Sequence, residues 1–148
     1  NPELGQVGKP VSSDRRLLDV LTKEGYLPVV ACVAGDANGA IYNVNGDQMA
    51  VSCAQGFHAE RLIFLTDVDG VRDGSGVVRT QLTVAEALQL ITDGVATGGM
   101  QAKIEAAVGG ILKGVNEIII APGAHAGIVA KLLNGEQIGT RIVRGETK

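Results

Sequence analysis

The residues best suited to chemistry follow a short apolar run near the middle of the chain. Leu62 to Leu65 reads L-I-F-L and is followed at once by Thr66, Asp67, Asp69 and Gly70. An unbroken run of strand-forming residues is typical of a strand buried on both faces of a parallel sheet, and ligands bind at the carboxyl ends of such strands. We therefore expect a central strand followed by a ligand-binding loop. A simple tight turn is the alternative, because Asp and Gly are ordinary turn residues.

A second polar group, Asn43, Asn45 and Asp47, stands at the start of a predicted helix that runs to about Gly56. Asn45 can cap this helix, and Asp47 in its first turn is favoured by the helix dipole. This structural explanation is complete in itself. Asparagine amides at a helix N-terminus could also donate hydrogen bonds to a bound carboxylate, so both interpretations stay open.

A third group lies where a loop of small residues, Val95 to Gly99, leads into a helix with an apolar stripe from Met100 to Leu112. Lys103 is expected in the first turn of that helix, where a cation opposes the helix dipole. Such a lysine is unfavourable for stability and useful if a phosphate is held there. A solvated lysine on an exposed face is the alternative.

The histidines and cysteines are weaker candidates. We expect His58 to be a surface or helix-capping residue, and His125 to help cap a helix over Ala126 to Leu133. A place for His125 in the lining of a ligand cleft is the alternative. Cys32 and Cys53 lie far apart within apolar patterns and lack metal-binding spacing. Buried structural thiols in a reducing compartment are therefore expected.

The elements that must position these residues alternate between helices and strands. Further helices are expected from a cap at Ser12 or Ser13 to Gly25, and from a capping box at Thr83 to Gly94. Strands are expected at Leu27 to Val33, Ala40 to Tyr42, Glu117 to Ala121 and Gly139 to Val143, with a hairpin at Asp73 to Gly76. This alternation predicts an α/β protein, a three-layer α/β/α sandwich with a mainly parallel sheet.

Composition limits the function. With 148 residues, 45% hydrophobic and 20% charged, the chain is long enough for one globular domain. A net charge of -3 without a cluster of Lys and Arg argues against a nucleic-acid or membrane partner. No signal peptide or bilayer-length apolar run is visible, so we expect a cytoplasmic protein. The common phosphate-binding motifs, G-x-x-x-x-G-K-[ST] and G-x-G-x-x-G after a strand, are missing, so any nucleotide must be held by another arrangement.

Taken together, four short motifs resemble the acetylglutamate kinases of the amino acid kinase family. They are N-V-N-G-D from Asn43, L-T-D-V-D-G-V from Leu65, T-G-G-M-Q-A-K from Thr97 and I-G-T-R-I from Ile138. Their order and approximate spacing are similar to that family over nearly the whole chain. The resemblance covers only the C-terminal, nucleotide-binding half, so we expect residues 1–148 to form that lobe without the N-terminal substrate lobe.

The resemblance implies ATP-dependent phosphorylation of the side-chain carboxylate of N-acetyl-L-glutamate in arginine biosynthesis. The implied cofactors are ATP and Mg²⁺ held through the nucleotide phosphates. The implied partners are N-acetyl-L-glutamate, the N-terminal lobe and, for the intact enzyme, further copies of itself. Alternatives are a non-catalytic nucleotide-binding fragment and a different amino acid kinase, acting on aspartate, glutamate or uridylate. The isolated chain is expected to be inactive, because the family's other catalytic lysine lies in the N-terminal lobe.

The resemblance also implies roles for individual residues. Lys103 matches a lysine that stabilises the transition state, and Asp47 an aspartate that holds catalytic lysines in place. Asn43 matches a contact to the acetylated amino acid, with Asn45 close by. The positions matching the surroundings of the nucleotide are Asp67, Val68, Asp69, Gly70, Val71, Arg72, Val95, Ala96, Thr97, Gly99 and Met100. No metal-binding residue is expected.

Two further expectations follow. Asn43, Asp67 and Lys103 should converge in one cleft at one edge of the sheet. Glu136 is followed by Gln137 where arginine-inhibited relatives commonly have a Glu-Gly pair, so no arginine response is expected from this chain. The Ala121 to His125 stretch also lacks the family's usual Asp-Gly-Arg type sequence.

Overall fold

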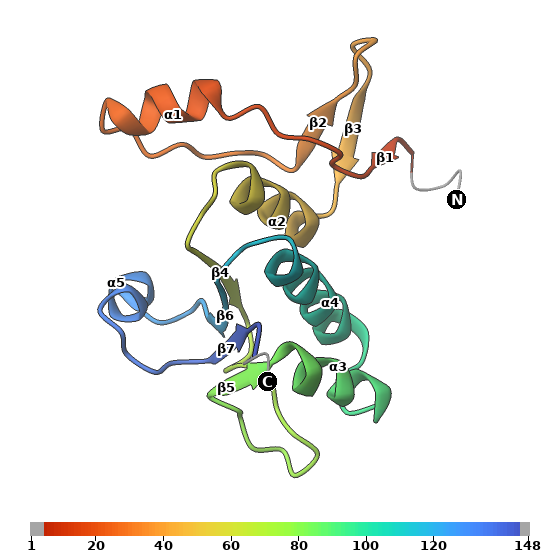
Figure 1. The fold of residues 1–148 in the computed structure, drawn as a ribbon, viewed down its shortest axis with the longest axis vertical. Coiled ribbons are helices and arrows are strands. Elements are labelled where there is room, and N and C mark those ends of the chain that lie inside the picture. Colours follow the sequence, from red (N-terminus) through yellow and green to blue (C-terminus); the bar gives the residue numbers. More distant parts are fainter. Residues whose placement is uncertain (1–4, 146–148) are drawn as a thin grey trace.

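The computed structural model describes residues 5–145 of the chain. Figure 1 shows two parts: an N-terminal arm, residues 5–44, and a larger α/β unit that follows it. The arm projects away from the larger unit, and helix α2 (Gly46–Gly56) lies at their junction. Leu17, Leu27 and Val29 of the arm are exposed, so much of the arm lacks a covering layer within the described chain.

The larger unit is built on a four-stranded sheet. Its strands are β4 (Arg61–Thr66), β5 (Gln81–Thr83), β6 (Glu117–Pro122) and β7 (Thr140–Val143). Their order is β4-β6-β7-β5, with β4 parallel to β6, β6 antiparallel to β7, and β7 parallel to β5. The predicted, mainly parallel sheet is therefore confirmed.

Strand β6, rather than β4, is the most deeply buried strand. Its residues Ile118 to Ala121 are fully buried, because their alternating side chains face two cores. Ile118 and Ile120 enter a large core with Phe64 of β4, while Ile119 and Ala121 enter a smaller core on the opposite face.

Helices cover both faces of this sheet. The large core is covered by α2, α3 (Val84–Thr92) and α4 (Gly98–Leu112), and the small core by α5 (Ile128–Leu133). Helix α4 supplies Ile104, Ala107 and Ile111 to the large core. Gly110 allows a close approach, because an added Cβ there would lie 2.7 Å from Cδ1 of Ile118. The predicted α/β layering is confirmed (Figure 1).

The prediction of a central β4 buried on both faces is wrong for the described chain. Strand β4 pairs with β6 along one side only, so it is an edge strand within residues 5–145. Phe64 is buried, but Leu65 remains 47% exposed. The apolar run predicts burial that this part of the chain does not provide.

The N-terminal arm carries β1 (Val7–Gly8), α1 (Arg16–Lys23), β2 (Val33–Gly35) and β3 (Ile41–Val44). The three strands form a small sheet in the order β1-β3-β2. Helix α1 begins at Arg16 and has no side-chain cap, so the predicted serine cap is wrong. Ser13 instead makes a hydrogen bond of 2.9 Å, through its Oγ, to Oγ of Ser52.

The strand predicted at Leu27 to Val33 is also largely wrong. Only Val33 lies in a strand, and Leu27 and Val29 are 89% and 93% exposed. A strand needs a hydrogen-bonding neighbour, and within residues 5–145 none pairs with Leu27 to Ala31. The carbonyl of Cys32 accepts one hydrogen bond, of 2.9 Å, from the backbone N–H of Val44 on β3. Strand-forming composition alone therefore leaves the segment extended and exposed.

Several local predictions can be checked directly. The capping box between Thr83 and Glu86 is confirmed, as is the turn after Arg72, where Asp73 accepts backbone hydrogen bonds from Ser75 and Val77. His58 is an exposed residue with a φ of 53° just after α2, as expected for a helix end.

The expectations for His125 and Cys32 are wrong. Helix α5 starts at Ile128 with Gly127 as its N-cap and no side-chain cap, so the imidazole of His125 caps nothing. Cys32 is exposed, and Cys53 is only half-buried. Burial raises the pKa of the Cys53 thiol, and the charge interaction with Cys32 raises it further. No helix within residues 5–145 has the length and apolar character needed to cross a bilayer.

Candidate functional site

Lys103 and Asp47 form the central ion pair of the candidate site. Nζ of Lys103 lies 2.8 Å from Oδ1 and 3.0 Å from Oδ2 of Asp47, joining α4 to α2. The two side chains are 17% and 27% exposed, so the pair is partly shielded from water. The same ammonium lies 5.0 Å from the ring centre of Phe64, within range of a cation–π interaction.

The position of Lys103 differs from the prediction. Because α4 begins at Gly98 rather than Met100, Lys103 lies in the second turn of the helix instead of the first. Its long side chain therefore reaches across to Asp47 on the neighbouring helix. The ammonium of Lys103 thus contacts the carboxylate of Asp47, whereas the alternative interpretation expected it to be solvated.

The side chain of Asn45 fixes the backbone at Asp47. The Oδ1 atom of Asn45 accepts hydrogen bonds from the backbone N–H groups of Asp47 and Gln48, at 3.1 and 3.2 Å. The capping interpretation is therefore confirmed for this oxygen, which fixes the first turn of α2. The Asn45 amide group is the part of that side chain left to act as a donor to a ligand.

Asn43 lies on β3, the middle strand of the small sheet. Its backbone N–H donates to the carbonyl of Gln6 at 2.8 Å, and its side chain is exposed. The following residue, Val44, is buried. Strand β3 thus carries Asn43 to the junction with α2, a few residues before Asp47.

The N-terminus of α4 is open in a way that suits an anion. Thr97 is the N-cap but makes no side-chain cap hydrogen bond, and the first turn contains no acidic residue. Gly98 has a φ of 56°, and added Cβ atoms on Gly98 and Gly99 would meet nothing within 4 Å. First-turn N–H groups without a side-chain acceptor are a suitable place for phosphate oxygens.

Backbone hydrogen bonds to α3 hold the loop before α4 in place. Ala96 is buried, and the backbone N–H groups of Val95 and Ala96 both donate to the carbonyl of Leu90, at 3.0 and 2.9 Å. These contacts hold the glycine-rich turn against the end of α3. The loop is therefore less free than its small residues suggest.

Thr140 organises the other loop, residues 67–72. Its Oγ1 accepts from the N–H of buried Val71 at 2.8 Å and donates to the carbonyl of Arg79 at 2.6 Å. Gly70 has a φ of 145°, and an added Cβ there would lie 2.7 Å from the same Oγ1. The glycine is thus required by both conformation and space.

The remaining polar residues of this loop contact one another. Oγ1 of Thr66 donates to Asp67 at 3.0 Å, and Arg72 makes an ion pair of 3.2 Å with Asp69. Arg72 also donates to the carbonyl of Gly76 at 2.8 Å. Val68 is partly exposed at the tip of the loop.

The structure therefore brings some predicted residues together more clearly than others. Asp47 and Lys103 are in direct contact, and Asn45 fixes the turn that carries Asp47. Two cavities have volumes of about 490 and 440 Å³. The described residues that line them do not include Asn43, Asp67 or Lys103. The convergence of these three residues in one cleft stays a prediction.

Two residues of this region were missed by sequence reasoning. Thr140 belongs to the I-G-T-R-I motif but was given no role, although its place in that motif was a usable signal. Phe64 was treated only as strand interior, and no local pattern indicates that a lysine 39 positions later lies over its ring.

Comparison with known proteins adds independent findings. Residues 3–122 match the model of the amino acid kinase family. Acetylglutamate kinase of Solibacter usitatus (strain Ellin6076) is 59% identical over 143 residues, which cover 97% of this chain and 56% of that protein. Acetylglutamate kinase of Rhizobium etli (strain CIAT 652) is 43% identical over 143 residues, covering 95% of this chain and 48% of that protein.

A solved structure is similar in fold. The N-acetylglutamate synthase from Neisseria gonorrhoeae, complexed with coenzyme A and N-acetyl-glutamate, matches with a TM-score of 0.87 at 25% identity. The match covers 96% of this chain and 33% of that one. The chain spans about half the length of the curated relatives that it matches.

Proposed function

Because the chain belongs to the amino acid kinase family, we propose that it is the C-terminal, nucleotide-binding lobe of an acetylglutamate kinase. The whole enzyme would transfer the γ-phosphoryl group of MgATP to the side-chain carboxylate of N-acetyl-L-glutamate, in arginine biosynthesis in the cytoplasm. The observation that carries this proposal is the 59% identity to the kinase of Solibacter usitatus over nearly the whole chain. The geometry around Lys103 supports it.

The N-terminus of α4 fits the phosphates of a nucleotide. Its uncapped N–H groups and the open space above Gly98 and Gly99 favour negative charge. The same helix carries Lys103, whose ammonium is held by Asp47. In this proposal residues 95–100 and the loop of residues 67–72 surround the nucleotide. When bound, MgATP supplies the phosphoryl group, and Mg²⁺, held through the phosphates, offsets part of their charge.

In this proposal Lys103 is the catalytic cation and Asp47 its positioning residue. Phosphoryl transfer requires little covalent chemistry from the protein and depends on oriented positive charge. A carboxylate that already holds an ammonium at 2.8 Å is suited to fixing that ammonium rather than to acting as a general base. Asp47 would therefore set the direction of the Lys103 side chain.

The acetylated amino acid would bind beside this pair. Asn43 is exposed on β3, and the amide group of Asn45 lies two positions further along the chain. Both side chains can donate hydrogen bonds to carbonyl or carboxylate oxygens. Asn43 lies on β3 and Asn45 caps α2, so both precede Asp47 by a few positions in the chain.

The proposed enzyme needs a second lobe, supplied in the same chain or by a partner chain. Two observations support such a partner. The outer side of β4 has no strand neighbour within residues 5–145, and the apolar residues Leu27 and Val29 of the arm are almost fully exposed. A covering lobe would bury both surfaces, and the intact enzyme is proposed to form homo-oligomers.

A second candidate is a nucleotide-binding module without turnover of its own. It is favoured by the uncapped N-terminus of α4, which can hold phosphate oxygens whether or not an acceptor binds. Under this alternative the chain binds nucleotide and phosphorylates nothing, whether or not the N-terminal lobe of the Solibacter usitatus kinase is added.

The test combines binding with activity. Calorimetric titration of the chain with MgADP should give weak, saturable binding that Lys103→Ala reduces and Lys131→Ala, an exposed lysine on α5, leaves unchanged. Phosphorylation of N-acetylglutamate, glutamate, aspartate and UMP is then assayed with and without the added lobe. Activity on N-acetylglutamate only with the lobe supports the proposal. Turnover of another acceptor would assign the chain to a different kinase, and absence of MgADP binding would contradict the nucleotide site itself.

A further inference from the structure

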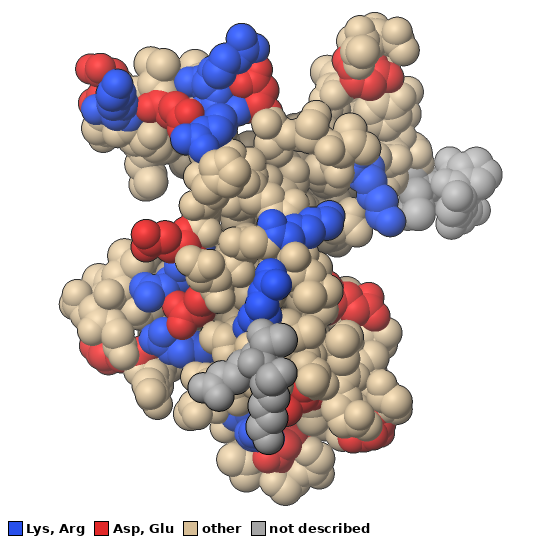
Figure 2. Space-filling view, viewed as in Figure 1, with Lys and Arg blue, Asp and Glu red and all other residues tan. Residues whose placement is uncertain are grey.

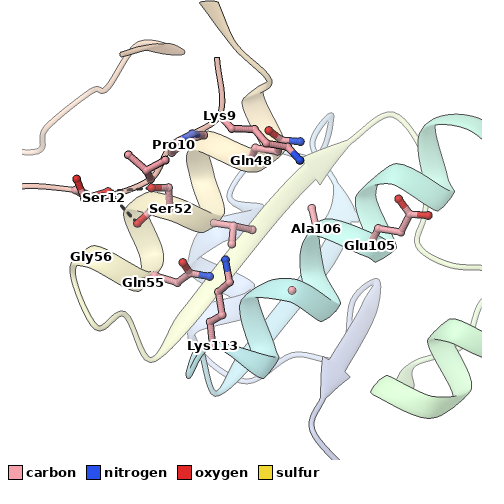
Figure 3. Close-up of a pocket in the computed structure, with 14 residues that line it drawn as sticks. Lys9, Pro10, Ser12, Gln48, Ser52, Gln55, Gly56, Glu105, Ala106 and Lys113 are labelled. Atoms are coloured by element: carbon pink, nitrogen blue, oxygen red, sulfur yellow. Dashed lines mark hydrogen bonds between the residues drawn. The ribbon is translucent and has the colours of Figure 1, made fainter. Parts of the chain in front are cut away.

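One of the two cavities has polar walls that include neither Lys103 nor Asp47. Its volume is about 490 Å³, and its walls come from residues 9–13 of the N-terminal arm, from α2 and from α4 (Figure 3). Nothing in the proposed nucleotide or substrate site uses it. Three segments distant in the sequence meet here, so the cavity is a product of the tertiary fold.

Positive charge dominates this cavity. Lys9 and Lys113 both line it, and neither makes an ion pair within the described part of the chain. The acidic residue on its wall, Glu105, accepts a hydrogen bond of 2.9 Å from Gln101. In Figure 3 the Glu105 side chain points away from Lys113. Figure 2 likewise shows basic side chains across the middle of this face, where the arm meets α2 and α4.

An unpaired amide adds a second, independent observation. Nε2 of Gln55 is buried and finds no hydrogen-bond partner among residues 5–145. Buried donors are nearly always paired, so such a group calls for an acceptor. In Figure 3 the amide of Gln55 and the ammonium of Lys113 point toward one another. Two donors that converge with no acceptor between them favour an anion at that point.

The rim of the cavity is held by specific contacts. Oγ of Ser13 in the arm donates to the carbonyl of Ser52 at 3.3 Å and shares a second hydrogen bond, of 2.9 Å, with Oγ of Ser52. It also lies against Gly56, where an added Cβ would come within 2.7 Å of the Ser13 Cβ. These contacts keep the arm beside α2, so the wall that carries Lys9 has a defined position.

From these observations we propose that the cavity binds a small anion that carries a carboxylate or phosphate group. Its oxygens accept hydrogen bonds from Gln55 and lie against the ammonium groups of Lys113 and Lys9. Because α2 and α4 carry Asp47 and Lys103 as well as cavity residues, a bound anion would also link the two helices of the proposed catalytic pair. The binding itself does not depend on the proposed kinase function.

The test is an NMR titration of the ¹⁵N-labelled chain with inorganic phosphate and, separately, with succinate. Glycerol serves as a neutral control, and ionic strength is held constant with sodium chloride. We expect saturable shifts of the Gln55 side-chain amide and the Ser52 backbone amide with at least one anion, and none with glycerol. Comparing phosphate with succinate identifies which group the site prefers. Shifts at Gly98 and Gly99 report the proposed nucleotide site separately, so one site can fail without the other.

Two variants with a matched control decide the assignment. Lys113→Gln should weaken binding about fivefold, the effect of losing one charge at about 4 Å in water. Gln55→Glu should abolish it, because a carboxylate of the same shape repels the anion. Lys131→Gln removes an equal charge from α5 and should leave the titration unchanged.

Four results would overturn the proposal. The first three are shifts that stay linear with both anions, equal weakening by Lys113→Gln and Lys131→Gln, and unchanged binding in Gln55→Glu. If Gln55→Glu raises thermal stability while the parent chain binds neither anion, Gln55 pairs directly with Lys113 and the cavity is not an anion site.

Discussion

At the scale of single residues, the Lys103–Asp47 pair joins two helices whose own sequences do not require each other. Lys103 is held between a carboxylate and the face of Phe64, so its ammonium has both an ionic and an aromatic partner. Partial burial makes the attraction stronger than at an open surface, while incomplete burial avoids the full cost of removing two charges from water. The pair can therefore contribute to stability as well as to the proposed catalysis.

A double-mutant cycle measures that contribution. Asp47→Asn and Lys103→Gln should each destabilise the chain, and their coupling energy should be about 1 kcal/mol, the upper range for exposed pairs. Urea unfolding of the two single variants and the double variant gives the value. Glu60→Gln, which changes an exposed carboxylate outside the helices, is the control and should show no coupling to Lys103. Strictly additive effects of Asp47→Asn and Lys103→Gln would argue against a stabilising pair.

Thr140 supports the second loop through one hydroxyl group. Thr140→Val keeps the shape but leaves the Val71 N–H and the Arg79 carbonyl without their partner, so it should cost about 1–3 kcal/mol of unfolding free energy. Thr140→Ser keeps the hydroxyl and should cost less. Thermal unfolding followed by circular dichroism compares the two variants. A larger loss in Thr140→Ser would show that the methyl group, not the hydrogen bonds, matters.

At the scale of elements, α4 packs closely on β6 because a glycine stands at the point of contact. Gly110→Ala should destabilise the protein by about 1–3 kcal/mol, since the new methyl group overlaps Ile118 in the large core. Gly109→Ala is the matched control on the same helix. Its added methyl group meets nothing within 4 Å, so it should stabilise by about 0.5–1 kcal/mol through helix propensity. Equal effects of the two changes on the urea midpoint would contradict this packing.

The capping box of α3 predicts a pH dependence. The Thr83 backbone N–H, assisted by the Thr83 hydroxyl, lowers the pKa of Glu86 below its ordinary value of 4.5. In the acid range the unfolded chain then binds more protons at this site than the folded chain, so stability falls as the pH drops below 4.5 toward the lowered pKa.

Glu86→Gln isolates this effect, because glutamine keeps the hydrogen bond to Thr83 without titrating. The melting temperature of Glu86→Gln should fall less than that of the parent chain as the pH is lowered through this window. Glu60→Gln, at an exposed position outside the helices, is the charge-matched control and should follow the parent. A parent-like acid profile in Glu86→Gln would contradict the assigned role.

At the scale of the whole molecule, the described chain leaves apolar surface without a cover. The exposed residues of the arm and the outer side of β4 share one feature: each needs a neighbouring backbone that residues 5–145 do not supply. Edge strands and strand-like segments of this kind readily accept another chain. This is the physical basis for proposing a second lobe.

Hydrogen exchange tests the proposed cover. In the isolated chain the amides of residue 27 and of residues 29–32 should exchange quickly, because none of them donates a hydrogen bond to a neighbouring strand within residues 5–145. When the N-terminal lobe of the Solibacter usitatus kinase is supplied, protection should rise there and along β4, while β6 should remain protected throughout. Unchanged exchange at both places, in a mixture shown to associate, would mean that the lobe binds elsewhere.

The sequence by itself determined the features that depend on neighbouring residues. Alternating patterns predicted the α/β class, the capping box gave the start of α3, and the Asp73 turn was recognisable from its residues. The order of four short motifs was enough for the family, which the comparisons confirmed. The roles of the individual site residues remain proposals.

The tertiary structure decided what depends on distant segments. It made β4 an edge strand, left Leu27 without a strand partner and exposed Cys32, because burial depends on which surfaces are covered and not on composition. It also set Lys103 against Asp47 and Phe64, since the start of α4 and the packing of α2 together fix where that side chain reaches. Local sequence patterns predict where a helix or strand forms, whereas the packing of distant segments determines which residues that helix or strand contacts.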